Sequence, residues 1–97
     1  MVNSAKAAEV ASQLSIRMSE RDAIMLLQTN NLTRGIGIPD GSMRNLMWDY
    51  YLSDGSILCL SFSGSTTATN VGSGLLKSAF IRSNGVTVLS IKLKNEP

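Results

Sequence analysis

The chain contains no histidine and a single cysteine among its 97 residues. Histidine is the commonest general base and metal ligand, so its absence removes every Ser-His and Cys-His catalytic pair of the usual form. The lone Cys59 excludes an intrachain disulfide and any cysteine-rich zinc site. We therefore predict a protein that is not an enzyme and that has no cofactor or metal site.

Long apolar runs and dense basic clusters are also missing. No apolar run approaches the ~20 residues that a membrane span needs, and the start of the chain, MVNSAKAAEV, contains no signal-peptide apolar segment. The sequence predicts no membrane span, and a chain that is either not exported or a trimmed mature form. Nine Lys and Arg are spread along the chain against seven Asp and Glu, without the cluster that binding to a phosphate backbone requires. We expect no nucleic-acid partner.

An apolar content of 43% suits one small domain spanning residues 1–97. Helix formers, with apolar residues spaced by three and four, predict a helix over residues 5–14. Ser19 is followed by acidic residues and an apolar stripe, which predicts a second helix that is capped by this serine and ends near Asn30. The next segment, residues 31–45, contains glycines and a proline without a sustained period, so we expect a connecting loop.

The stretch YYLSDGSILCLSF, residues 50–62, predicts two strands around a turn. A two-residue loop of Asp54 and Gly55 would split the large apolar residues between the two faces of the hairpin. A three-residue loop of Ser53, Asp54 and Gly55, with the glycine in the left-handed region, places them all on one face. We predict this second register, whose helix-facing row is Trp48, Tyr50, Leu52, Leu58, Leu60 and Phe62.

Asn84 and Gly85 give the second hairpin signal, because this dipeptide favours a two-residue turn. Strict alternation along the flanking strands places one row against the helices: Leu76, Phe80, Leu89, Ile91 and Leu93. The opposite row is Lys77, Ala79, Ile81, Val86, Val88 and Lys92. The expected fold class is α+β, with two N-terminal helices packed on one face of a four-stranded antiparallel sheet.

Two of these segments resemble motifs of known families. The segment IRMSERDAIMLL, residues 16–27, is similar to the helix entry of the BamE (SmpA/OmlA) lipoprotein family. Met18 and Ser19 match this motif, while Arg17 stands where those proteins usually have glycine. The segment WDYYLSDGSILCLSF, residues 48–62, is similar to the strand, Asp-Gly turn and strand of BamE and of the repeat of β-lactamase inhibitor protein, called BLIP-like. The expectation of four strands favours the BLIP-like version.

The resemblance implies a non-enzymatic protein-binding module of the cell envelope or of the secreted type. It also implies a periplasmic or secreted location, while the chain itself shows no signal peptide and leaves a cytoplasmic location open. The expected partner is another protein of unknown identity or a second copy of the chain.

The predicted sheet face away from the helices is the candidate binding site. It is more apolar than the free face of an antiparallel sheet usually is, which suggests a covered surface. The candidate interface residues are Tyr51, Ile57, Cys59, Ile81 and Val88, with Lys77 and Lys92 at the margin. The alternative is that the register is wrong and that part of this row belongs to the core.

A small enzyme or ligand-binding domain is the alternative function, with a site near the glycine-rich segment GIGIPDG, residues 35–41. Phosphate-binding glycine loops follow a strand and precede a helix. This segment instead follows a predicted helix and precedes a predicted strand, so we favour a plain loop. Asp40 and Asp49 could supply a carboxylate pair or calcium ligands. Cys59 lacks the neighbouring histidine base that would activate it as a nucleophile, so we interpret it as a small strand residue.

Overall fold

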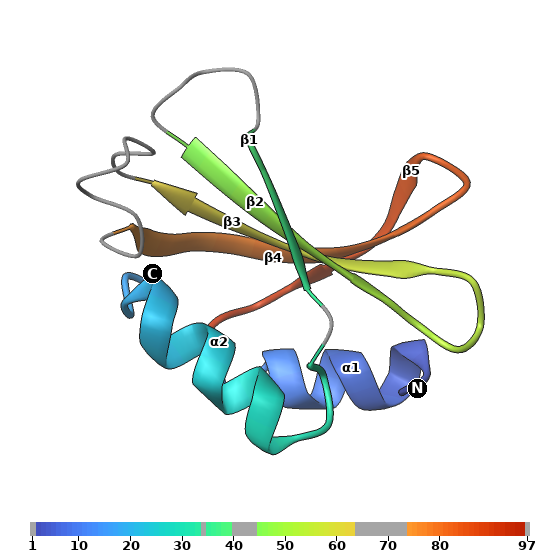
Figure 1. Cartoon of the computed structure of the whole chain (residues 1–97), viewed down its shortest axis with the longest axis horizontal. Helices are drawn as coiled ribbons and strands as arrows, with labels where there is room; N and C mark the ends of the chain where they lie inside the picture. The colour runs from blue at the N-terminus through green and yellow to red at the C-terminus, as the bar shows by residue number, and fades with distance from the viewer. Residues whose placement is uncertain (1, 34, 40–44, 64–73, 97) are drawn as a thin grey trace.

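Two helices lie on one face of a five-stranded antiparallel sheet in the computed structural model, which describes residues 2–33, 35–39, 45–63 and 74–96. Figure 1 shows both helices beneath the sheet, and within the described residues no helix lies on the opposite face. The expected α+β arrangement is therefore confirmed. The expectation of four strands is wrong, because the sheet has five.

The elements are numbered in the order in which they follow one another along the chain. Helix α1 spans Ser4–Ala11 and helix α2 spans Glu20–Thr29. The strands are β1 (Ile36–Pro39), β2 (Asn45–Tyr51), β3 (Ile57–Ser63), β4 (Leu75–Ser83) and β5 (Val86–Ile91). Each strand pairs antiparallel with the next, so β3 lies at the centre of the sheet and β1 and β5 are its edges.

Both helices start at side-chain caps. Asn3 Oδ1 accepts a hydrogen bond from a backbone N–H of the first turn of α1 at 2.8 Å, and Ser19 Oγ does the same for α2 at 3.1 Å. Helix α2 ends next to Asn30, as predicted. Helix α1 ends at Ala11, earlier than predicted, but the turn that follows still places Leu14 fully in the core.

The strand that was not predicted is β1, which lies within the segment that the sequence predicts to be a loop. It pairs with β2. Gly35, just before β1, and Gly37, within it, make room for aromatic rings of β2. A Cβ on Gly35 would lie 2.6 Å from Cζ of Tyr50, and a Cβ on Gly37 would lie 3.3 Å from the ring of Trp48. This strand is short and rich in glycine, so it shows no alternation of apolar and polar residues and was not predictable from that pattern.

The hairpin of β2 and β3 has the predicted register. Tyr51 pairs with Ile57 and Tyr50 pairs with Leu58, which leaves a three-residue loop after Leu52 that ends at Gly55. The glycine has a φ of 86°, the left-handed conformation that this loop requires. The predicted helix-facing row lies against the helices, with Trp48 partly buried and the other five residues buried.

Hydrogen bonds join the tip of this hairpin to the start of α1. Asp54 Oδ2 accepts a hydrogen bond from Ser4 N at 3.0 Å, and Ser53 N donates to Val2 O at 2.9 Å. Asp54 Oδ1 also accepts from Ser56 N at 3.1 Å. The hydrogen bonds from Ser4 and then from Ser56 favour the ionised carboxylate, so the pKa of Asp54 lies well below its usual range.

The hairpin of β4 and β5 has the predicted turn but not the predicted faces. Asn84 and Gly85 form the two-residue loop, with φ values of 53° and 78°. The pairing of β4 with β3 skips Lys77, and the pairing of β5 with β4 skips Val88, so each of these residues forms a β-bulge. Each bulge shifts the alternation of side chains by one residue.

The bulge at Lys77 turns the side chain of Ile81 toward the helices, opposite to the prediction. Both Leu76 and Ala79 face the helices across the bulge, and Ile81 follows them into the core with 2% of its surface exposed. Phe80, which strict alternation placed in the core, lies on the opposite side of the sheet, directly across from Cys59. The prediction that Ala79 and Ile81 face away from the helices is therefore wrong, because the bulge at Lys77 shifts the alternation of β4 by one residue.

Candidate functional site

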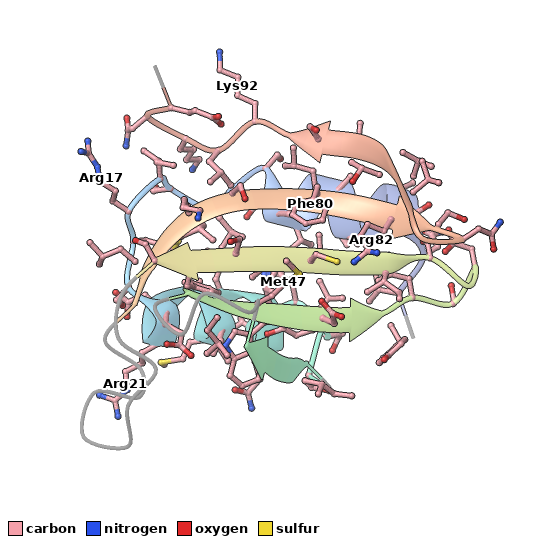
Figure 2. The ribbon with its side chains drawn as sticks, turned by 90° about the horizontal axis from the view of Figure 1, so that it is seen from above. Arg17, Arg21, Met47, Phe80, Arg82 and Lys92 are labelled. Carbon is pink, nitrogen blue, oxygen red and sulfur yellow. The ribbon has the colours of Figure 1, made fainter. Side chains whose placement is uncertain are left out.

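The sheet face opposite the helices is the candidate site, and we call it the outer face. Figure 2 looks onto this face, with Met47, Phe80 and Arg82 labelled on it. The pairing of β2, β3 and β4 places nine residues there: Met47, Asp49, Tyr51, Ile57, Cys59, Ser61, Ser78, Phe80 and Arg82. The face therefore contains five apolar or aromatic side chains, two serines, one carboxylate and one guanidinium.

Cys59 lies at the centre of the outer face, between Asp49 on β2 and Phe80 on β4. Its side chain is completely buried by these neighbours although no helix covers it. Burial, followed by the Asp49 carboxylate, raises the pKa of the Cys59 thiol to about 12, while Arg82 acts in the opposite direction. The thiol therefore stays protonated near neutral pH, and a thiolate nucleophile is disfavoured.

The side chains of Asp49, from β2, and Arg82, from β4, both lie close to the buried thiol. Asp49 Oδ1 is buried and has no hydrogen-bond partner among the described residues. Arg82 lies over the sheet toward β3 (Figure 2), but the described residues include no ion pair between these two side chains within 4.0 Å. A buried oxygen without a partner costs about 1–3 kcal/mol, so the carboxylate favours an additional hydrogen-bond donor.

The seven predicted interface residues are not brought together as expected. Tyr51, Ile57 and Cys59 lie on the outer face. Ile81 lies in the core, and Lys77 and Val88 form the bulges of β4 and β5. Lys92 follows β5 and extends from the edge of the sheet (Figure 2).

The sequence reasoning missed four residues of the outer face. The regular alternation of β2 would have found Met47, because it lies two residues before Asp49. Ser78, Phe80 and Arg82 were hidden by the bulge at Lys77, since no residue pattern marks the place where the alternation shifts.

The glycine-rich segment forms a packed strand rather than a ligand loop in its described part. Gly35 and Gly37 lie against aromatic rings of β2. Asp40 and Gly41 lie outside the described residues, so the suggested pair of Asp40 with Asp49 has no described geometry. Among the described residues, no three of the His, Cys, Asp and Glu side chains are grouped to hold a metal ion, and no helix is long and apolar enough to cross a membrane.

A buried carboxylate also lies on the helix side of the sheet. Glu20, at the start of α2, is 4% exposed, and its Oε1 accepts a hydrogen bond from Trp48 Nε1 at 2.8 Å. Burial and the nearby Glu20 raise the pKa of Tyr50 to about 12. The bond between Glu20 and Trp48 joins α2 to β2, and we assign it a structural role. Its only sequence signal is the acidic first turn of a helix.

Comparison of the chain with known proteins gives no match to a family model, to a curated protein or to a solved structure. The resemblance to the BamE and BLIP-like families therefore stays a prediction.

Proposed function

We propose that the protein is a non-enzymatic binding module that uses its outer face to bind another polypeptide. The observation that carries this proposal is the composition of a sheet face that no described helix covers. An antiparallel sheet with one face in water usually shows polar residues on that face, but Met47, Ile57 and Phe80 lie there and are half-buried. Apolar residues gathered on an uncovered face often mark a protein interface.

The residue types of the outer face support a protein partner. Aromatic residues, methionine and arginine are enriched in the centres of protein interfaces, and the outer face presents Tyr51 and Phe80 beside Met47 and Arg82. Ser78 on β4 is half-buried on the same face and supplies a hydroxyl group for a hydrogen bond to a partner. This mixture fits a polypeptide surface better than a purely apolar ligand.

We further propose a periplasmic or secreted setting, which rests on the resemblance to the BamE and BLIP-like families. One backbone feature supports the motif: Arg17, at the position usually held by glycine, has a φ of 65°. Glycine adopts this left-handed conformation readily, whereas other residues adopt it at a cost. Detection of the protein in periplasmic or cytoplasmic fractions of its own cells tests this part of the proposal.

Site-specific photocrosslinking tests the binding role. The photoreactive residue p-benzoylphenylalanine is placed at Phe80 on the outer face, and in a matched control at Met25, which is 57% exposed on α2. We expect a defined crosslinked species from position 80 and none from position 25 in cells that make the protein. The same products from both positions, or none from position 80, would contradict the proposal.

A further inference from the structure

The tight turn of residues 15–18, which leads into α2, lies between the start of β4 and the segment that follows β5. On one side Arg17 N donates a hydrogen bond to Leu76 O at 2.8 Å. On the other side Ile16 N donates to Lys94 O at 2.9 Å. Two consecutive N–H groups therefore hold these two distant segments together, and the two carbonyl oxygens that accept from them lie within roughly 10 Å of each other.

This turn gathers four exposed cations that are far apart in the sequence. Lys77 directly follows the buried Leu76, and the two C-terminal lysines alternate with the buried Ile91 and Leu93, so all of them extend away from the core. Arg17 and Lys92 both extend into solvent in the upper left of Figure 2. We call the four residues the basic patch: Arg17, Lys77, Lys92 and Lys94.

The charges of the basic patch have no carboxylate partner in the part of the chain that the structure describes. There the only ion pair within 4.0 Å joins Lys6 to Glu9 on α1. The carboxylate that is nearest to the patch in sequence, Glu96, accepts a hydrogen bond from Leu93 N at 2.8 Å. Like charges that are held close together repel one another, so the patch favours an anionic partner.

The basic patch also includes an arginine whose backbone conformation favours glycine. Met18 N closes the turn by donating to Ser15 O at 3.1 Å, and Arg17, at the third position, has a φ of 65°. A four-residue turn with a positive φ at this position usually contains glycine there. Residues held in costly conformations cluster at functional sites, which supports a role for the guanidinium of Arg17.

An acidic segment of a polypeptide matches the size and charge of the basic patch. Lysine and arginine form charge-assisted hydrogen bonds with carboxylates. Alternate residues of an extended segment lie about 7 Å apart on one side, so two or three carboxylates can reach across a patch of this width. A nucleic-acid interface commonly buries about 1,000 Å² of protein surface or more, which is larger than the area around these four cations.

We propose that the basic patch binds an acidic segment of a polypeptide partner, with Arg17 and the three lysines facing its carboxylates. The choice of a polypeptide rests on the proposed function, whereas the choice of an acidic one rests on the patch itself. Lys77 and Lys92, which the sequence placed at the margin of the interface, then bind the same partner segment.

Fluorescence anisotropy with a labelled peptide of alternating glutamate and serine tests the proposal. A peptide with glutamine in place of glutamate is the neutral control. We expect only the acidic peptide to bind, and we expect its affinity to fall as the salt concentration rises. Lys77→Gln and Lys94→Gln should each weaken binding about two- to five-fold, the loss expected for one exposed ion pair. Lys6→Gln removes the same charge from α1 and should leave the affinity unchanged.

Arg17→Gly separates binding from folding. Glycine adopts a positive φ readily, so this variant should melt at or above the temperature of the parent. It should nevertheless bind the acidic peptide about two- to five-fold more weakly, because one exposed ion pair is lost. Circular dichroism melting measures the first effect and the anisotropy titration measures the second. An Arg17→Gly variant that binds as tightly as the parent would contradict the role of the guanidinium.

Three further results would overturn the inference: equal binding of the acidic and neutral peptides, a loss in Lys6→Gln as large as that in Lys94→Gln, or binding to phosphatidylglycerol vesicles or a single-stranded DNA oligonucleotide without binding to the acidic peptide. Any of these together with a crosslink at position 80 would reject the basic patch and leave the outer face standing. Acidic-peptide binding that depends on the patch, with no crosslink at position 80, would reject the outer face and support the basic patch.

Discussion

Strands β2 and β3 pair without interruption, from Asn45 with Ser63 to Tyr51 with Ile57, whereas β4 and β5 each contain a bulge. The two hairpins also differ in burial. All residues of β3 between its two ends are buried, while every residue of β5 before Ile91 is exposed. The first hairpin forms the centre of the core, and the second extends from it to the edge of the sheet.

This difference shows what determines the face of a side chain. In a regular hairpin the loop length sets the register, and the register sets every face. In a bulged strand one extra residue exchanges the two faces beyond it, so Ile81 enters the core and Phe80 leaves it. The β4 residues of the outer face are thus a consequence of the bulge at Lys77.

The largest expected effect tests that bulge directly. Ile81→Lys places a charge in the core and should destabilise the fold by about 4 kcal/mol or more. Phe80→Lys, one residue earlier, should cost about 1 kcal/mol, because the lysine head reaches water from the outer face. Urea unfolding measures both. Strict alternation of the two faces predicts the reverse order, and that order would reject the bulge.

A smaller effect is expected when one leucine of each hairpin is replaced by alanine and the losses of unfolding free energy are compared. Leu60, on β3, is fully buried, whereas Leu89, on β5, is 46% exposed. Leu60→Ala should cost about 2–5 kcal/mol, as buried leucines do, and Leu89→Ala about 1 kcal/mol or less. The same unfolding experiment reports both free energies. Equal losses would mean that the second hairpin contributes as much to the core as the first.

The tips of the two hairpins should respond alike. Gly55 and Gly85 both have positive φ values, and no atom lies within 4 Å of a Cβ added at either position. Gly55→Val and Gly85→Val should therefore each cost about 1–2 kcal/mol through the backbone alone. The matched changes to asparagine, which tolerates this conformation, should cost less. A valine variant that melts at the parent temperature would contradict the assigned turn.

The smallest expected effect is a pH dependence of stability that comes from Asp54 at the tip of the first hairpin. The folded pKa of Asp54 is lowered below the unfolded value of about 3.9. Its contribution to stability is therefore fully present above about pH 5 and is lost as the pH falls through the folded pKa. Asp54→Asn should lower the melting temperature at neutral pH, and the difference from the parent should shrink in acid. A difference that is constant down to pH 3 would contradict the ionised cap at Ser4.

Local chemistry made much of the fold predictable from the sequence. The cap at Ser19, the glycine loop at Gly55 and the turn at Asn84 each need particular residue types at one place, and all three were found. These features gave the helices, the hairpin tips and the faces of the first hairpin. They also placed Tyr51, Ile57 and Cys59 correctly on the outer face.

Features that depend on packing between distant segments were not predictable. Gly35, just before β1, and Gly37, within it, lie against the rings of Tyr50 and Trp48, and the periodicity of a single sequence cannot show that contact. The bulge at Lys77 lets both Leu76 and Ala79 reach the core, which is decided by the helices beneath them. For this reason the prediction from the sequence placed Phe80 in the core and Ile81 on the outer face, the reverse of their observed positions.

A dilution series followed by amide chemical shifts tests most directly whether the outer face binds a second copy of the chain, one of the two expected partners. The shifts of Cys59, Phe80 and Arg82 should change as the concentration rises from micromolar to millimolar, because two outer faces come together. The amides of α2 and of the Asn84 turn should stay constant and serve as internal controls. Shifts that change only in α2 or at the β5 edge, with the outer face unaffected, would contradict the account.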